Sequence, residues 1–138
     1  MKLKTMLFIA TLSGLSANAF NPEMGNYIKK LKIEAKKMDG SFVDFDPSQG
    51  EILFTTKHKG KKGDMISCVS CHNSDLKTTG KNIFTNKPIE PLSPKANSQR
   101  LTNVKDVEKW LKRNFNDVYV REGTAKEKGD VLYYINSK

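Results

Sequence analysis

One stretch decides the fold of this sequence: Cys68-Val69-Ser70-Cys71-His72. It holds both cysteines of the 138-residue chain, separated by two residues, and a histidine directly follows the second. Thiols at this spacing can add across the two vinyl groups of one porphyrin, and the next residue then places an imidazole beneath the iron. The stretch therefore predicts one covalently bound haem c, attached through Cys68 and Cys71, with His72 as an axial ligand of the iron.

The same cysteines allow two other interpretations, and both fit the sequence less well. A redox dithiol of the thioredoxin type needs a preceding strand in a βαβ unit, whereas glycine, lysine and Asp64-Met65-Ile66-Ser67 precede this motif. A structural zinc ion takes four ligands, and the candidates here are Cys68, Cys71, His72 and His58. Adjacent Cys71 and His72 would then have to converge on one metal without the usual second pair of ligands.

The second axial position of the iron is less determined. Electron-transfer cytochromes commonly use methionine there, but no methionine follows Met65 and no histidine follows His72. The remaining candidates are His58, a lysine, a weak oxygen ligand or no protein ligand at all. His58 also stands among lysines and glycines in the segment 57–63, where a solvated loop residue is the simpler role.

The first nineteen residues are typical of an export signal. Lys2 and Lys4 give a positive start, residues 6–12 form a short apolar run, and Ala17-Asn18-Ala19 has the small-x-small pattern that signal peptidase recognises. The apolar run is far shorter than the ~20 residues of a transmembrane helix, so an uncleaved anchor fits less well. We therefore predict cleavage after Ala19, a cytochrome c domain over residues 20–138, and localisation in the periplasm.

The chain is strongly basic. Its formal net charge of +9 falls to +7 when Lys2 and Lys4 leave with the signal. A basic surface favours encounter with an acidic redox partner through electrostatic steering, whereas nucleic acid fits poorly because an exported protein rarely meets it. A solvated helix face is the simpler explanation of many of the lysines, among them Lys29, Lys30, Lys32, Lys36 and Lys37.

The mature chain is predicted to be all-α, a small single-domain cytochrome c-like fold with about four helices around one haem. Apolar residues at spacings of three and four predict a first helix over residues 22–37. Asp46-Pro47 combines a capping acid with proline at the first helical position, and so predicts a second start. The apolar residues of that short helix are Ile52, Leu53 and Phe54.

Two more helices are predicted in the C-terminal third. One begins at Thr102 or Asn103, and the other at Thr124, where Thr124 and Glu127 match a capping box. Their expected buried residues are Val104, Val107, Trp110 and Leu111, and then Val131, Leu132, Tyr134 and Ile135. Residues 73–101 show no clear period, and a loop of that length in a compact domain is either functional or disordered.

Several short segments carry a likeness to one known family. They are the haem motif with Asp75 after it, Thr85-Asn86-Lys87-Pro88-Ile89-Glu90-Pro91-Leu92, Arg100-Leu101-Thr102, Val107-Glu108-Lys109-Trp110, Arg113-Asn114 and Glu127-Lys128-Gly129-Asp130. In these segments the chain resembles the SHP-type monohaem cytochromes c, named from the sphaeroides haem protein. With a looser helix pattern upstream, the likeness covers most of the mature chain.

The resemblance implies an unusual sixth ligand, an asparagine side chain that falls on Asn114. Val107, Trp110 and Asn114 have the spacing i, i+3, i+7, so one helix face would carry an apolar residue, an indole and an amide. Trp110 would then belong to the haem pocket. From spacing alone, Asn114 also fits a helix C-cap and Trp110 also fits plain core filling.

The sequence departs from the family at one point beyond this ligand. The family usually has two cysteines that bridge the following loop, and Phe115 and Gly123 stand at those positions here. We therefore expect the loop over residues 116–121 to be untethered.

The expected function is haem binding and electron transfer, with a weakly ligated distal site able to bind oxygen or nitric oxide. The resemblance implies a dihaem cytochrome c and a membrane cytochrome b as redox partners. The alternatives are a dedicated binder or scavenger of diatomic gases and a bis-histidine carrier that uses His58. No catalytic residue stands out, so a conventional enzyme is not predicted, although oxygen or nitric oxide reduction stays open.

Overall fold

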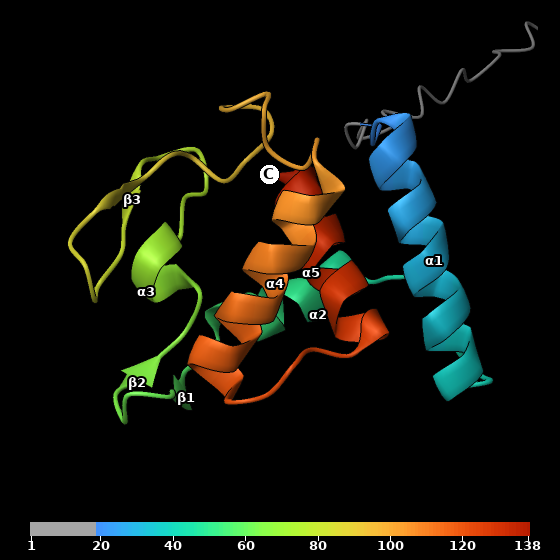
Figure 1. Cartoon of the computed structure of the whole chain (residues 1–138), viewed down its shortest axis with the longest axis horizontal. Helices are drawn as coiled ribbons and strands as arrows, with labels where there is room; N and C mark the ends of the chain where they lie inside the picture. Colours follow the sequence, from blue (N-terminus) through green and yellow to red (C-terminus); the bar gives the residue numbers. More distant parts are fainter. Residues whose placement is uncertain (1–18) are drawn as a thin grey trace, which may run out of the picture.

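The structure is a computed structural model that describes residues 19–138, so the predicted export signal up to residue 18 lies outside the described residues. In this part of the chain five helices and two small antiparallel sheets form (Figure 1). The helices are α1 (Pro22–Met38), α2 (Pro47–Thr55), α3 (Val69–His72), α4 (Val104–Tyr119) and α5 (Ala125–Ser137). The all-α prediction is confirmed, and the additional helix, α3, is a single turn inside the cysteine–histidine motif. In residues 19–138 no helix has the length and apolarity needed to cross a membrane.

Capping side chains set where the helices begin. Asn21 caps α1, and Asp46 caps α2 as predicted. Asn103, one of the two predicted residues, caps α4 through a hydrogen bond that its side chain accepts. The predicted capping box begins α5: Thr124 Oγ1 accepts from Glu127 N at 3.2 Å, and the Glu127 carboxylate accepts from Thr124 N at 2.8 Å.

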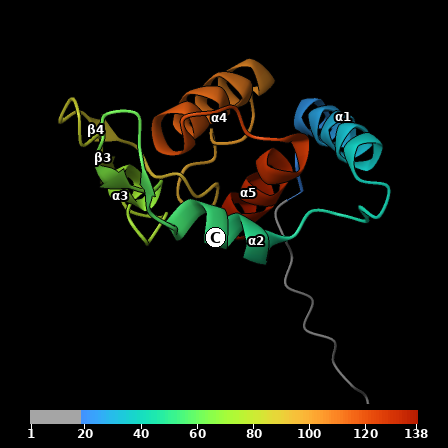
Figure 2. The same ribbon diagram turned by 90° about the horizontal axis from the view of Figure 1, so that it is seen from below.

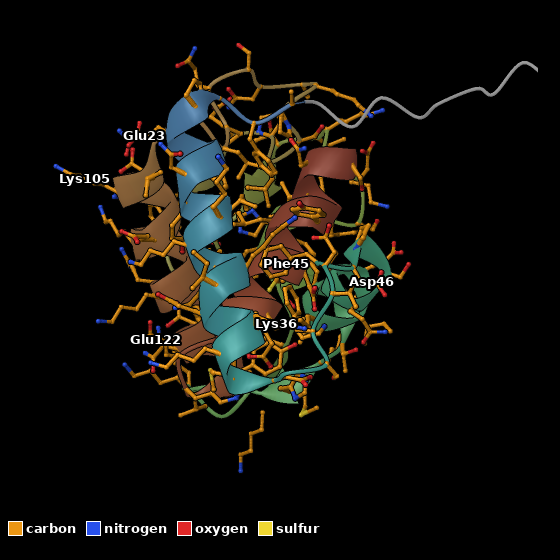
Figure 3. All side chains as sticks on the ribbon, turned by 90° about the vertical axis from the view of Figure 1, so that its right-hand side faces the viewer. Glu23, Lys36, Phe45, Asp46, Lys105 and Glu122 are labelled. Carbon is orange, nitrogen blue, oxygen red and sulfur yellow. The ribbon has the colours of Figure 1, made fainter. Side chains whose placement is uncertain are left out.

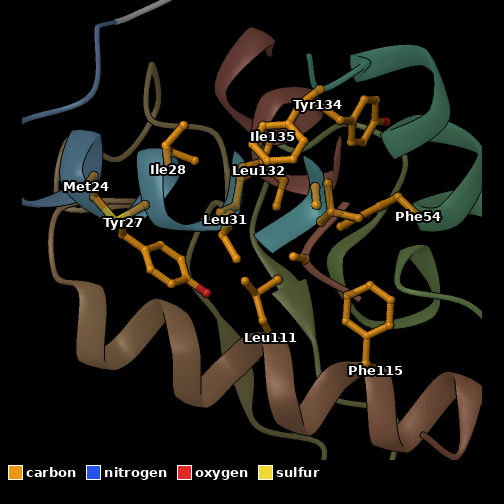
Figure 4. Packing of buried hydrophobic residues seen from close by; sticks show 14 of the residues in the cluster. Met24, Tyr27, Ile28, Leu31, Phe54, Leu111, Phe115, Leu132, Tyr134 and Ile135 are labelled. Carbon is orange, nitrogen blue, oxygen red and sulfur yellow. The ribbon is translucent and has the colours of Figure 1, made fainter. Parts of the chain in front are cut away.

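The main core lies where α1, α4 and α5 meet. Figure 4 shows side chains of α1 and α5 pointing toward Leu111 and Phe115, which project from α4. The predicted buried face of α5 is confirmed, because each of its four members is at most 5% exposed; they are Val131, Leu132, Tyr134 and Ile135. This core fixes α4 relative to the rest of the domain.

The segment that follows α1 is bonded back to the end of that helix. Lys36 Nζ donates hydrogen bonds to the carbonyl oxygens of Gly40 and Phe42, at 2.6 and 3.0 Å. Phe42 and Phe45 pack against one another in the core, and Figure 3 shows Phe45 beside α1. The predicted solvated lysines of α1 are exposed, apart from the half-buried Lys32, which pairs with Asp44 at 2.8 Å.

α2 and α5 approach one another very closely (Figure 2). The contact occurs at Gly50, where an added Cβ would overlap the Asp130 carbonyl oxygen and lie 2.8 Å from Tyr134 Cβ. The Asp130 carboxylate is buried, and it accepts hydrogen bonds from Asp46 N at 2.8 Å and Lys126 Nζ at 2.6 Å. A backbone contact and a buried carboxylate thus hold α2 onto α5.

Two short hairpins flank the cysteine–histidine motif. Before it, β1 (His58–Lys59) pairs with β2 (Met65–Ile66), and after it β3 (Gly80–Lys81) pairs with β4 (Pro88–Ile89). Beyond β4, the N–H groups of Leu92 and Ser93 both donate to the Leu76 carbonyl at 2.9 Å. The segment 73–101, which lacks a sequence period, is therefore ordered and folds back onto the residues that follow the motif.

The structure corrects the sequence prediction at α2 and α4. α4 continues to Tyr119, so residues 116–119 are helical and not part of a loop. Trp110 is 46% exposed. Neighbouring residues of a helix point about 100° apart around its axis, so Trp110 is turned away from the core that Leu111 faces. Ile52 in α2 is likewise 55% exposed, whereas Phe54 is buried.

Candidate functional site

α3 presents the three residues that the sequence singled out most strongly. Cys68 precedes the turn, and its carbonyl accepts hydrogen bonds from Cys71 N at 3.2 Å and His72 N at 3.0 Å. Both thiols are free and half-buried. Burial, reinforced by the nearby Cys71, raises the pKa of the Cys68 thiol to about 12. The turn ends at Asn73, whose positive φ of 63° is combined with a ψ of 169°, a backbone conformation that residues other than glycine rarely adopt.

The hairpin after the motif packs directly against α3. A Cβ added to Gly80 would overlap the Cys71 carbonyl oxygen and lie 3.1 Å from His72 Cα, so only glycine allows this approach. Asn73 Nδ2 donates to Thr79 O at 3.0 Å, just before Gly80. β3 is thereby fixed against the backbone of the motif.

His72 rests on an aromatic support from α2 and α5. Its ring centroid lies 6.0 Å from that of Phe54, which in turn lies 5.4 Å from that of Tyr134. Burial, followed by the positive charge of Arg100, lowers the pKa of His72 to about 4. The imidazole is therefore neutral at pH 7, which is the form that binds a metal ion.

These residues fit a covalently bound haem. His72 Nδ1 is the one buried side-chain nitrogen or oxygen in residues 19–138 that lacks a hydrogen-bond partner. Such an imidazole fits a site whose other partner is a bound group and not a protein atom. Two free thiols in one helical turn beside it would hold the porphyrin. In the described part of the chain, no three His, Cys, Asp or Glu side chains group as metal ligands, so His58 does not complete a zinc site.

Asn114 and Trp110 lie on one flank of α4. Asn114 is half-buried beside the buried Phe115. Two cations lie near the Trp110 ring, with Arg113 Cζ 5.1 Å and Lys109 Nζ 5.3 Å from the ring centroid. Asn114 is five residues from the end of the helix, and Val120 is the C-cap, so the alternative role of Asn114 as a helix cap is wrong.

His58, on β1, lies at the C-terminal end of α4. Its ring centroid is 4.3 Å from that of Tyr119, whose hydroxyl donates to the Leu53 carbonyl at 2.6 Å. Burial raises the pKa of Tyr119 to about 12, and the proximity of Cys68 adds to the effect. His58 therefore has a packing role between the β1–β2 hairpin and α4, rather than that of a solvated loop residue.

The positions beyond Asn114 are tied together without cysteines. A Cβ on Gly123 would lie 2.7 Å from Phe115 Cε2, so the ring packs against the glycine backbone. Arg121 forms a two-pronged pair with the Glu127 carboxylate, with N–O distances of 2.6 and 2.8 Å. The expectation of an untethered segment is therefore wrong: an aromatic contact and an ion pair hold it.

Several residues of the site were missed by the sequence analysis. Phe54 and Tyr134 were predicted only as apolar core, and Tyr119, Gly80 and Arg100 had no assigned role. A glycine eight residues after the histidine is the one sequence signal for the close approach of β3. The aromatic support has no local signal, since α2 and α5 meet only in the fold.

A helical domain that presents this motif, with its histidine packed on aromatic side chains, has the features of the monohaem c-type cytochromes. Comparisons with known proteins support this class. A family model described as "Domain of unknown function (DUF1924)" matches residues 40–135. The cytochrome c-type protein SHP of Cereibacter sphaeroides is 41% identical over 121 residues, which cover 88% of this chain and 93% of that protein. Cytochrome c'' of Methylophilus methylotrophus is 34% identical over 88 residues, or 64% of this chain and 61% of the relative.

Solved structures share the fold. Oxidized SHP, described as an oxygen binding cytochrome c, matches with a TM-score of 0.73 and 34% identity, over 83% of this chain and 96% of that one. Oxidized cytochrome c'' from Methylophilus methylotrophus matches with a TM-score of 0.72 and 28% identity, over 81% and 91% of the two chains. The chain belongs to the SHP and cytochrome c'' family, and it is a c-type cytochrome with one covalently bound haem.

Proposed function

We propose that this cytochrome is exported to the periplasm, transfers electrons through its haem, and uses Asn114 as a weak sixth ligand that admits small diatomic molecules. One observation carries the ligand assignment. The half-buried amide of Asn114 lies on the flank of α4 beside Trp110, whereas the His58 ring is already packed on Tyr119. The oxygen binding attributed to the related SHP supports the open site.

The chemistry of the two axial candidates differs. When bound, haem c supplies an iron that takes up and releases one electron. His72 is held neutral and fixed on Phe54, so it offers a strong ligand in both oxidation states. The Asn114 amide oxygen is a hard, neutral donor that suits ferric iron better than ferrous iron. We expect Asn114 to hold the sixth position in the oxidised protein and to yield it on reduction.

A basic surface beside the motif suits an acidic redox partner, such as the dihaem cytochrome c that the family resemblance implies, itself served by a membrane cytochrome b. The β1–β2 hairpin carries four exposed lysines and leads directly into α3; they are Lys57, Lys59, Lys61 and Lys62. Lys62 Nζ also lies 4.2 Å from the Phe84 ring centroid, which joins this hairpin to the segment between β3 and β4. We propose these lysines as the encounter surface.

Absorption spectra of two variants test the ligand assignment. Asn114→Ala should change the spectrum of the oxidised haem, whereas His58→Ala should leave it unchanged. Carbon monoxide added to the reduced wild type should shift the Soret band. A change from low-spin to high-spin in His58→Ala would instead establish bis-histidine ligation, and a Soret band indifferent to carbon monoxide would leave plain electron transfer.

Export and the partner surface have separate tests. Periplasmic protein should have the mass of the chain from Phe20 plus one haem, and retained residues 1–19 would contradict cleavage. Reduction by an acidic donor should slow as salt rises, and Lys59→Gln/Lys61→Gln should slow it at low salt more than the matched α1 pair Lys29→Gln/Lys30→Gln. Equal effects of the two pairs would show that only the net charge matters.

A further inference from the structure

Arg100 has an incomplete set of partners for a half-buried guanidinium. Its Nε donates to the Pro91 carbonyl at 2.9 Å, and Nη2 donates to the Glu90 carbonyl at 2.8 Å. Nη1 makes no hydrogen bond, and no carboxylate in residues 19–138 lies within ion-pair distance. The other two arginines differ, because Arg121 pairs with Glu127 and Arg113 lies over the Trp110 ring.

The position of Arg100 brings this charge toward the haem motif. The two carbonyls that it binds directly follow β4, which pairs with β3, and β3 packs on the backbone of Cys71 and His72 through Gly80. The next residues, Leu92 and Ser93, donate to the Leu76 carbonyl four residues after His72. Arg100 is thereby tied to the segments that pack on the haem motif.

We propose that Arg100 binds an ionised carboxylate side chain of the haem, a propionate, and by its charge raises the reduction potential of the iron. Haem carries two such carboxylates. Burying a cation costs free energy unless a group of opposite charge pairs with it, and a propionate would be that group for Arg100. Guanidinium is suited to this role, since its flat fork binds carboxylates through two hydrogen bonds. The two backbone carbonyls hold that fork in place. A positive charge near the iron disfavours the ferric state, which carries one more positive charge than the ferrous state.

The test compares midpoint potentials of holoprotein variants, measured by spectroelectrochemistry. Arg100→Gln keeps donors for the two carbonyls but removes the charge, so its potential should fall. Arg100→Lys keeps the charge and should lie between Arg100→Gln and wild type. Lys37→Gln removes one charge from an exposed residue of α1, on the side of the molecule away from α3 (Figure 1), and should keep the wild-type potential.

Either of two results of the potential measurements would overturn the proposal. An unchanged potential in Arg100→Gln, with reduced thermal stability, would mean that Arg100 only tethers the loop. An equal fall in Lys37→Gln would mean a general charge effect. If Arg100→Gln fails to fold, redox-induced infrared difference spectra of wild type and Arg100→Lys decide the matter. The propionate carboxylate band should differ between guanidinium and ammonium partners, and identical bands would refute the contact.

Discussion

The side of the molecule beneath His72 and the side around Asn114, the sixth ligand that we propose, are built differently. Beneath His72, α2 and α5 touch backbone to backbone at Gly50, and the supporting Phe54 and Tyr134 are 2% and 4% exposed. Around Asn114 the contacts are more exposed: the segment after α4 is held by the contact of Gly123 with Phe115 and by the Arg121–Glu127 ion pair, and Trp110 is 46% exposed. Close packing resists displacement, whereas exposed ion pairs contribute little. The first arrangement suits a permanent ligand, and the second suits the detachable ligand that we propose at Asn114.

The largest effect should come from closing the space between α2 and α5. Gly50→Ala places a methyl group onto the Asp130 carbonyl, and backbone cannot move aside as a flexible side chain can. We expect a loss of about 3 kcal/mol in the free energy of unfolding, measured by denaturant titration of the haem protein. The Soret band of the haem should also broaden, because α2 carries Phe54, on which the His72 ring rests.

Gly25→Ala is the matched control for this substitution. Gly25 is also inside a helix, α1, but an added Cβ meets nothing within 4 Å. Alanine should therefore raise the stability by up to about 1 kcal/mol through helix propensity. Equal losses in both variants would show that the α2–α5 contact is not especially close.

A smaller effect is expected at the end of α4. In Gly123→Ala the new methyl group would press on the Phe115 ring at 2.7 Å, and this buried ring would have to shift within the core. We expect a loss of about 1–2 kcal/mol and a change in the oxidised spectrum, since Asn114 neighbours Phe115. Gly40→Ala, with nothing within 4 Å of the added Cβ, should change neither quantity. A stable Gly123→Ala variant with the wild-type spectrum would show that the contact of Phe115 with Gly123 does not position Asn114.

The difference between the two sides also explains what could be predicted from the sequence. Local signals were sufficient for the motif in α3, for the Asp46 cap and for the capping box at Thr124, because each depends on neighbouring residues. The exposure of Trp110 was not predicted, because the spacing of apolar residues along α4 does not tell which edge of the apolar helix face is turned to the core. The contacts of Gly50 with Asp130 and of His58 with Tyr119 join residues 80 and 61 positions apart, and no local pattern reports such pairs.

The smallest effect concerns Tyr119, which joins the two sides because it ends α4 and its hydroxyl donates to Leu53 of α2. Tyr119→Phe removes that hydrogen bond and should cost about 1 kcal/mol at pH 7. The variant should also resist alkali better than the wild type. Burial raises the pKa of Tyr119 to about 12 in the folded protein, whereas an unfolded tyrosine ionises near 10. Between these values the unfolded chain releases a proton that the folded protein retains, so stability falls as pH rises.

Tyr27→Phe separates the two contributions. Burial raises the pKa of Tyr27 to about 12 as well, but no hydrogen bond of its hydroxyl joins it to residues 19–138. Denaturant titrations at pH 7 and pH 11 should therefore find Tyr27→Phe unchanged at pH 7 and improved at pH 11. Tyr119→Phe should be weakened at pH 7 and should lose less between the two pH values than the wild type does. If Tyr119→Phe matched the wild type at pH 7, the bond to Leu53 would not hold α4 to α2, and the two sides would be coupled only through the hydrophobic core.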